Sequence, residues 1–263
     1  MEELFGYVGA FLIGLVLGLT GGGGSILTVP VLVYILGIQP VKATAYSLFI
    51  VGMTAAFGSI LNYRKGLVEL KVGLKFALPS LVAIYATRKI IVPALPEFFF
   101  SLGAISVTKD FFIMALFAIV MMLASFSMLS DKAISTSKTQ PSPIRTIIQI
   151  FSVGIIIGLV GAGGGFLIIP ALVFLAKLPM KKAVGTSIFI IAINSLIGFT
   201  GDIGNLNPNW RFLLIFSFIA ILGIFAGVYL SKFIKENNLK KGFGWFVLVM
   251  SILILSKELF FKL

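Results

Sequence analysis

The stretch Gly18-Leu19-Thr20-Gly21-Gly22-Gly23-Gly24-Ser25-Ile26-Leu27-Thr28-Val29-Pro30 returns 140 residues later as Gly158-Leu159-Val160-Gly161-Ala162-Gly163-Gly164-Gly165-Phe166-Leu167-Ile168-Ile169-Pro170. Aligned without gaps at this offset from Gly14 to Gly58, the chain matches itself at 16 of 45 positions. Chance similarity between apolar stretches would not keep the glycines and the proline in register. Because a constant offset is the signature of repeated architecture, the sequence predicts two structurally related halves.

The composition indicates a membrane protein. Of 263 residues, 59% are hydrophobic and 11% are charged, against about 25% charged residues in a soluble domain. Apolar runs of about 20 residues recur along the chain, and each is long enough to cross a hydrocarbon core about 30 Å thick. The formal charge of +12 comes from lysines and arginines that are scattered between these runs. We therefore expect membrane lipid, and no nucleic acid, as the partner of these cations.

The residue types that are missing narrow the function further. The chain has no cysteine and no histidine, so it lacks the usual thiolate nucleophile, the usual proton shuttle and the commonest metal ligand. We therefore expect a protein that is not an enzyme and that has no catalytic residues, no metal site and no cofactor.

Hydropathy predicts five apolar segments in each half, at residues 4–20, 25–37, 43–62, 70–92 and 110–129 and at residues 144–160, 165–178, 183–202, 210–232 and 242–259. The second segment of each half has only about 13 or 14 residues, which is too short to span comfortably. The first two segments of each half would then form a short helical hairpin with a glycine tip. Since each half crosses the membrane an odd number of times, the predicted fold is an all-α integral membrane protein of two inverted-topology repeats.

The boundary between the halves is a polar segment with two prolines at residues 130–143, which indicates a cytoplasmic linker. It separates an N-terminal membrane repeat, residues 1–129, from a C-terminal membrane repeat, residues 144–263. This orientation puts 14 of the 21 basic residues on the cytoplasmic side, as the positive-inside rule requires. We expect a multi-pass protein of the cell membrane with both termini outside, and a homodimer is left open.

The glycine tips, residues 21–24 and 161–165, are the candidate site. Non-helical backbone at membrane depth must be buried in protein or line a watery cavity, so the two tips are expected to meet near the midplane. The helices that follow would point backbone N–H groups at a small anion, and no cationic side chain is expected in the core. The predicted substrate-binding residues here are Thr20, Gly21, Gly22, Gly23, Gly24, Ser25, Gly161, Gly163, Gly164 and Gly165.

Glycine clusters also have a plain structural explanation, which is close packing between membrane helices. Gly14-xxx-Gly18 and Gly154-xxx-Gly158 fit this explanation better than a binding role. Pro30 and Pro170 are interpreted as residues that shape a helix and do not contact the ligand.

A second group of polar residues follows each hairpin. Ser47, Thr186 and Ser187 stand in the first turns of the next helix, where they either line the pathway or bond back to their own backbone. Asn194 needs a partner inside a membrane helix, and it either lines the pathway or joins two helices. Asp202 ends its segment, so it is a candidate for coupling to a proton or sodium ion, although an interfacial role is the favoured interpretation.

At these residues the sequence resembles the sulfite exporter TauE/SafE family of membrane permeases. The pattern G-x-G-G-G-x-x-x-x-P-x-L is complete at residues 161–172, followed by Ala-x-Gly-Thr-Ser at residues 183–187. It occurs at residues 21–32 with Ser25 in place of the last glycine. The resemblance implies transport of sulfite, organosulfonates or other small sulfur-containing anions. Tyr46 replaces the threonine of the second half and would narrow the cavity.

Three kinds of function follow from these observations. The leading hypothesis is a secondary carrier whose two tips form one anion site reached alternately from each side. An anion channel would use the same tips as a selectivity constriction. A membrane subunit that transports nothing is the third alternative.

Overall fold

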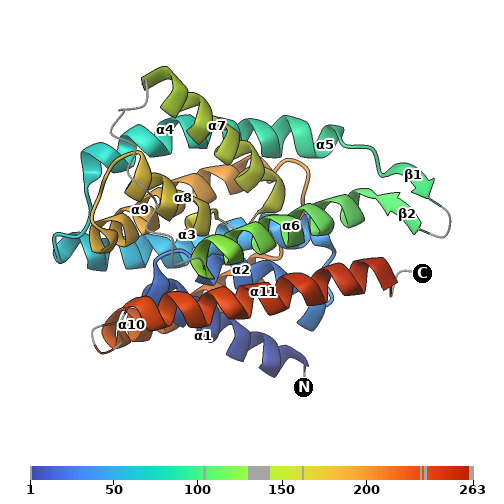
Figure 1. The fold of residues 1–263 in the computed structure, drawn as a ribbon. Coiled ribbons are helices and arrows are strands. Elements are labelled where there is room, and N and C mark those ends of the chain that lie inside the picture. The colour runs from blue at the N-terminus through green and yellow to red at the C-terminus, as the bar shows by residue number, and fades with distance from the viewer. Residues whose placement is uncertain are drawn as a thin grey trace.

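The computed structural model describes residues 2–102, 105–129, 143–161, 163–231, 233 and 236–260 (Figure 1). Nearly all of the predicted linker therefore lies outside the described residues. The helices of the first half are α1 (Glu2–Thr20), α2 (Gly24–Pro30), the π-helical turn η1 (Val31–Ile35), α3 (Pro40–Arg64), α4 (Leu70–Ala86), the π-helical turn η2 (Thr87–Ile91), α5 (Val92–Ala94) and α6 (Lys109–Leu129). Those of the second half are α7 (Pro143–Val160), α8 (Gly165–Phe174), α9 (Met180–Thr200), α10 (Trp210–Leu230) and α11 (Glu236–Phe260).

The helices have the length and surface of a membrane protein. Within the described ranges, five of them are long and apolar enough to span a bilayer, and they lie at 40–64, 70–94, 109–126, 180–200 and 210–230. Large apolar side chains face outward on α6, α10 and α11, where Leu123 is 65% exposed, Phe218 61% and Trp245 59%. Apolar patches of this kind are rare on soluble monomers, and lipid is the solvent that suits them. The predicted all-α membrane fold is confirmed.

Each predicted apolar segment corresponds to a helix, including the short second segment of each half. Helix α2 ends at Pro30 and continues as a π-helical turn. Helix α8 has 10 residues. Both short helices are too short to cross a bilayer in the α-helical state.

One antiparallel hairpin was not predicted. Strands β1 (Phe98–Leu102) and β2 (Ile105–Thr108) pair with Phe100 opposite Val107. The hairpin projects from one end of the bundle beyond α5 and α6 (Figure 1). It lies between two apolar segments, in a region for which the hydropathy pattern gave no element.

The largest helix contacts join one half of the chain to the other. Helix α1 packs against α10 of the second half, and α7, the counterpart of α1, packs against α4, the counterpart of α10. Two further large contacts join counterparts directly, α3 with α9 and α6 with α11, and the last two lie side by side in Figure 1. Exchanging the halves therefore turns the first two contacts into each other and leaves the other two unchanged. The inversion of one half relative to the membrane stays a prediction.

Glycines allow the close contacts of α1 with α10 and of α7 with α4. A Cβ on Gly14 of α1 would overlap the carbonyl oxygen of Ala220 and lie 2.9 Å from the backbone nitrogen of Ile224 in α10. Likewise, a Cβ on Gly154 of α7 would lie 2.8 Å from the carbonyl oxygen of Ser80 in α4. These backbone-to-backbone approaches confirm the predicted packing role of both glycine pairs.

Candidate functional site

The first glycine tip is held by its own short-range hydrogen bonds. Helix α1 ends where Gly21 takes φ +77°, a left-handed conformation that costs glycine little. The Thr20 hydroxyl donates to the carbonyl oxygen of Val16 over 2.8 Å and accepts the N–H of Gly23 over 2.9 Å. The Ser25 hydroxyl donates to the carbonyl oxygen of Gly22 over 2.7 Å. In this conformation both hydroxyl protons are used inside the tip.

The second tip depends more strongly on glycine. Gly161, Gly163 and Gly164 have φ values of +71°, +62° and +70°, and any side chain at these positions would strain the backbone. The last of them begins α8 by accepting the N–H groups of Leu167 and Ile168 at 3.0 Å each. Sequence therefore dictates this turn locally, because left-handed residues in such a run are accessible mainly to glycine.

The two tips touch backbone to backbone in the interior. A Cβ on Gly22 would lie 2.5 Å from the carbonyl carbon of Gly165, and a Cβ on Gly165 would lie 3.0 Å from the carbonyl oxygen of Gly22. Both residues are buried. The predicted meeting of the tips is confirmed, whereas their depth in the membrane and their binding of an anion stay predictions.

Each tip rests on the central helix of the other half. The Ser187 hydroxyl of α9 donates to the carbonyl oxygen of Gly21 over 2.8 Å and also lies 2.8 Å from the carbonyl oxygen of Val184. In the pseudo-equivalent place, a Cβ on Gly161 would lie 2.6 Å from the carbonyl oxygen of Thr44 in α3. Ser47, the counterpart of Ser187, is fully buried, and its hydroxyl has no partner among the described residues.

Removing the Ser187 hydroxyl is expected to loosen the first tip. A Ser187→Ala variant leaves the buried carbonyl of Gly21 without this donor, a loss of about 1–3 kcal/mol. We expect a lower midpoint of thermal unfolding for the detergent-solubilised protein. Ser152→Ala is the control, because the exposed Ser152 hydroxyl bonds only to Ile148 of its own helix. Equal midpoints for the two variants would contradict a supporting role for Ser187.

Two of the predicted site residues have partners away from the tips. The Thr186 hydroxyl accepts the N–H of Glu69 over 3.0 Å, in the loop before α4. Asn194 of α9 donates from Nδ2 to the Ser80 hydroxyl of α4 over 2.7 Å. This hydrogen bond joins two helices, which is one of the two roles predicted for Asn194. The structure instead puts an unpredicted residue, Ser195, beside the second tip, where its Oγ would lie 3.1 Å from a Cβ on Gly163.

The expectation that no cationic side chain lies in the core is wrong. Arg88, in the π-helical turn η2, is fully buried, and its Nε lies 2.6 Å from Oδ2 of Asp202. Its Nη1 donates to the Thr44 hydroxyl over 3.1 Å and to the carbonyl oxygen of Gly158 over 3.3 Å. The missed signal is that Arg88 falls inside the predicted segment 70–92, where a charge requires an internal partner.

Asp202 is that partner, and the coupling and interfacial roles considered for it stay predictions. Its side chain, in the turn after α9, is 7% exposed. Burial raises the pKa of the Asp202 carboxyl, and the neighbouring Arg88 guanidinium opposes the shift. Removing one member of a buried ion pair typically costs about 3–5 kcal/mol, since the other charge is left uncompensated.

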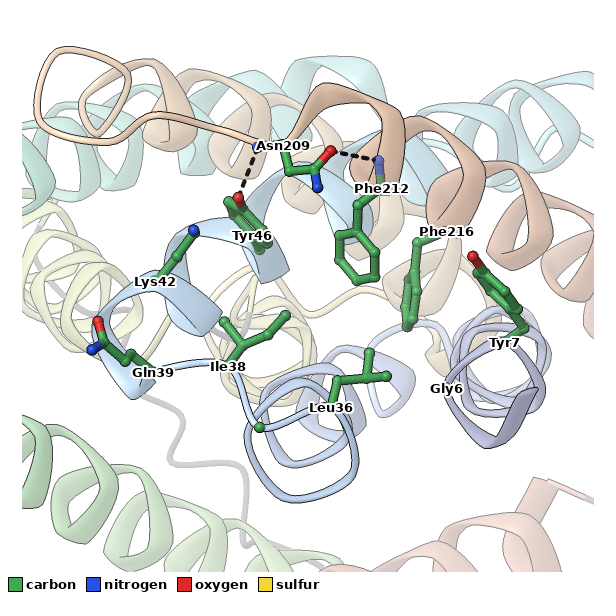
Figure 2. A pocket seen from close by; sticks show the side chains of 11 residues that line it. Gly6, Tyr7, Leu36, Ile38, Gln39, Lys42, Tyr46, Asn209, Phe212 and Phe216 are labelled. Atoms are coloured by element: carbon green, nitrogen blue, oxygen red, sulfur yellow. Dashed lines mark hydrogen bonds between the residues drawn. The ribbon is translucent and has the colours of Figure 1, made fainter. Parts of the chain in front are cut away.

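A pocket opens at the end of the bundle where α3 and α10 begin (Figure 2). Its cavity volume is about 670 Å³, and its lining comes from Gly6, Tyr7, Leu36, Gly37, Ile38, Gln39, Lys42, Tyr46, Asn209, Phe212 and Phe216. The Tyr46 hydroxyl accepts the N–H of Asn209 over 2.8 Å, and the Lys42 ammonium lies 5.4 Å from the centre of the Tyr46 ring. None of the predicted substrate-binding residues lines this pocket.

Residues 7–254 match the family model of sulfite exporter TauE/SafE proteins. The "Probable membrane transporter protein" of Xylella fastidiosa strain Temecula1 is 29% identical over 255 residues, which cover 94% of this chain and 92% of the relative. The "Probable membrane transporter protein YunE" of Bacillus subtilis is 29% identical over 243 residues, covering 78% and 82% of the two chains. That of Methanocaldococcus jannaschii, MJ0441, is 38% identical over 112 residues, covering 40% and 42%. No solved structure matches the chain significantly.

Proposed function

Because the chain belongs to the sulfite exporter TauE/SafE family of membrane transporters, we propose that it is a secondary carrier of a small sulfur-containing oxyanion. Sulfite, an organosulfonate or a related anion is the substrate class. The observation that carries the proposal is the buried contact between Gly22 and Gly165. It joins two interrupted helices from two related halves, which is the arrangement at substrate sites of many secondary transporters.

The chemistry of the tips suits an oxyanion. Glycine backbone lets a ligand approach closely, and N–H groups at interrupted helices carry partial positive charge. The hydroxyl protons of Thr20 and Ser25 are engaged within the first tip. Two hydroxyls near the tips remain to donate, those of Ser47 and Ser195, because both are buried and have no partner among the described residues.

Access from the outside would lead through the pocket between α1, α3 and α10. Under the predicted orientation, with both termini outside, the pocket opens to the exterior. Tyr46 lines the pocket (Figure 2), and Ser47 is the next residue of α3. An anion would be attracted by Lys42 and would then reach the tips when the helices that surround Tyr46 separate.

Flux measurements with purified protein in proteoliposomes test this function. We expect saturable uptake of radiolabelled sulfite, and we expect unlabelled sulfite inside the vesicles to accelerate it, because a carrier exchanges substrate across one alternating site. Sulfate, thiosulfate, short sulfonates and acetate define the substrate class by competition. Currents far above carrier turnover would contradict the carrier in favour of a channel. An absence of flux for every sulfur oxyanion would contradict the substrate class.

A further inference from the structure

Arg88 brings unused hydrogen-bond donors into the protein interior. A guanidinium has five N–H donors in a fixed fork. Three of them are used, by Asp202 at Nε and by Thr44 and Gly158 at Nη1. Nη2 has no partner within the part of the chain that the structure describes, although the side chain is fully buried. A buried donor of this kind requires a ligand, a water or a cost in free energy.

The guanidinium lies at the base of the second glycine tip. Thr44, which receives one Nη1 bond, is the residue on which Gly161 rests. Gly158, which receives the other, stands in the last turn of α7, directly before the tip. The two contacts therefore hold the positive charge beside the turn that the proposed function assigns to the substrate.

The contact of α1 with α10 is the repeat counterpart of the contact of α7 with α4, and it has no charged residues at the positions that match Arg88 and Asp202. At the repeat offset, Arg88 corresponds to Val228 of α10 and Asp202 to Asn62 of α3. Val228 is buried and apolar, and the Asn62 side chain donates to the carbonyl oxygen of Gly58 in its own helix. Helices α1 and α10 thus pack with no ion pair at this place. The repeat architecture does not require the pair that α4 carries opposite α7.

The backbone around Arg88, directly after α4, is also unusual. It lies in the π-helical turn η2, and the matching segment of α10 is ordinary α-helix. Single π-helical turns occur frequently at functional sites, because they turn a side chain to a direction that the regular helix does not offer. The turn and the charge are therefore two separate departures from the repeat, and they occur at one residue.

We propose that Arg88 contacts the transported oxyanion through Nη2, with Asp202 as a positioning residue that fixes the guanidinium. The ligand class is a small oxyanion such as sulfite or a sulfonate, whose oxygens would accept charge-assisted hydrogen bonds from the two N–H groups of Nη2. This inference rests on the proposed function. In the proposed site between the two tips, the positive charge of Arg88 would then lie on the side of the second tip.

Four variants of the full-length protein test the assignment in proteoliposomes with sulfite as the probe. Arg88→Lys keeps the charge and loses the fork, and we expect the KM for sulfite to rise about tenfold or more while the protein stays folded. Arg88→Gln is expected to abolish saturable uptake. Asp202→Asn is expected to raise the KM more than it lowers the maximal rate, and Asp202→Glu to restore part of the affinity.

The double variant Arg88→Gln/Asp202→Asn separates binding from stability, because no uncompensated charge remains. We expect its thermal midpoint to recover towards that of the parent protein while sulfite uptake stays lost. Lys89→Gln is the control, since Lys89 is exposed and bonds to Tyr85. Recovery of both stability and sulfite affinity in the double variant would overturn the assignment.

The Arg88→Lys variant provides an independent test if the double variant does not fold. An unchanged KM for sulfite in Arg88→Lys would also overturn the assignment. A failure of the proposed function itself is distinguishable, because the parent protein would then transport no sulfur oxyanion.

Discussion

Replacing Gly22 with alanine is expected to abolish anion transport while the protein still folds and inserts. The new Cβ would lie 2.5 Å from the carbonyl carbon of Gly165, so the two tips must move apart. Gly22 does not have a positive φ, so alanine adds bulk there without backbone strain. A misplacement of about 1 Å among contacting groups can cost a reaction about a hundredfold, and we expect a loss of sulfite flux of at least that order.

The measurement is the initial rate of sulfite uptake in proteoliposomes that contain equal amounts of variant and parent protein. Gly204→Ala is the matched control, because a Cβ at Gly204 meets nothing within 4 Å and its φ is ordinary. Gly165→Ala approaches the same contact from the other side and is expected to reproduce the loss. Full uptake by both tip variants would count decisively against the tips as the pathway.

Replacing Gly14 with leucine is expected to prevent stable folding. Its Cβ would overlap the carbonyl oxygen of Ala220 and lie 2.9 Å from the backbone nitrogen of Ile224. Both obstacles are backbone atoms, so α1 and α10 must separate along the contact that joins the halves. Overpacking typically costs about 1–3 kcal/mol and sometimes more, and a backbone collision between two spanning helices lies at the upper end or above it.

The fraction of extracted protein that elutes as a single symmetric peak in detergent measures this loss. Gly242→Leu is the control, since a Cβ at Gly242 has nothing within 4 Å. Because the contact of α7 with α4 is the repeat counterpart of this one, Gly154→Leu in α7 is also expected to reduce stable folding. A normal elution profile for both variants would contradict the packing role of these glycines.

The architecture could be predicted from the sequence because hydropathy and glycine act locally. Apolar runs determine where helices lie, and the doubled glycine stretch determines where they break. The contact of Gly22 with Gly165 followed from one physical requirement, that irregular backbone at membrane depth be buried. Anion binding by the Thr20 and Ser25 hydroxyls stays a prediction, and no local pattern indicated that both would donate within the tip itself.

The chemistry of the core depends on contacts that no local pattern encodes. Arg88 and Asp202 are 114 positions apart and lie in different halves. Their repeat counterparts, Val228 and Asn62, are uncharged, so aligning the two halves does not reveal the pair. The pocket beside Tyr46 likewise needs three helices from both halves. The hairpin at residues 98–108 was missed because its strands, of five and four residues, are too short to produce a hydropathy peak.

The packing of α1 against α10, a helix of the other half, has a consequence for biosynthesis. Helix α1 is complete about 190 residues before its partner α10 begins, a delay of roughly ten to forty seconds at ribosomal rates. A spanning helix tolerates this delay, because its backbone hydrogen bonds are satisfied internally. Helix α2, with seven residues, cannot wait alone in lipid. The first tip therefore needs other parts of the protein around it until the second tip has been synthesised, about 140 residues later.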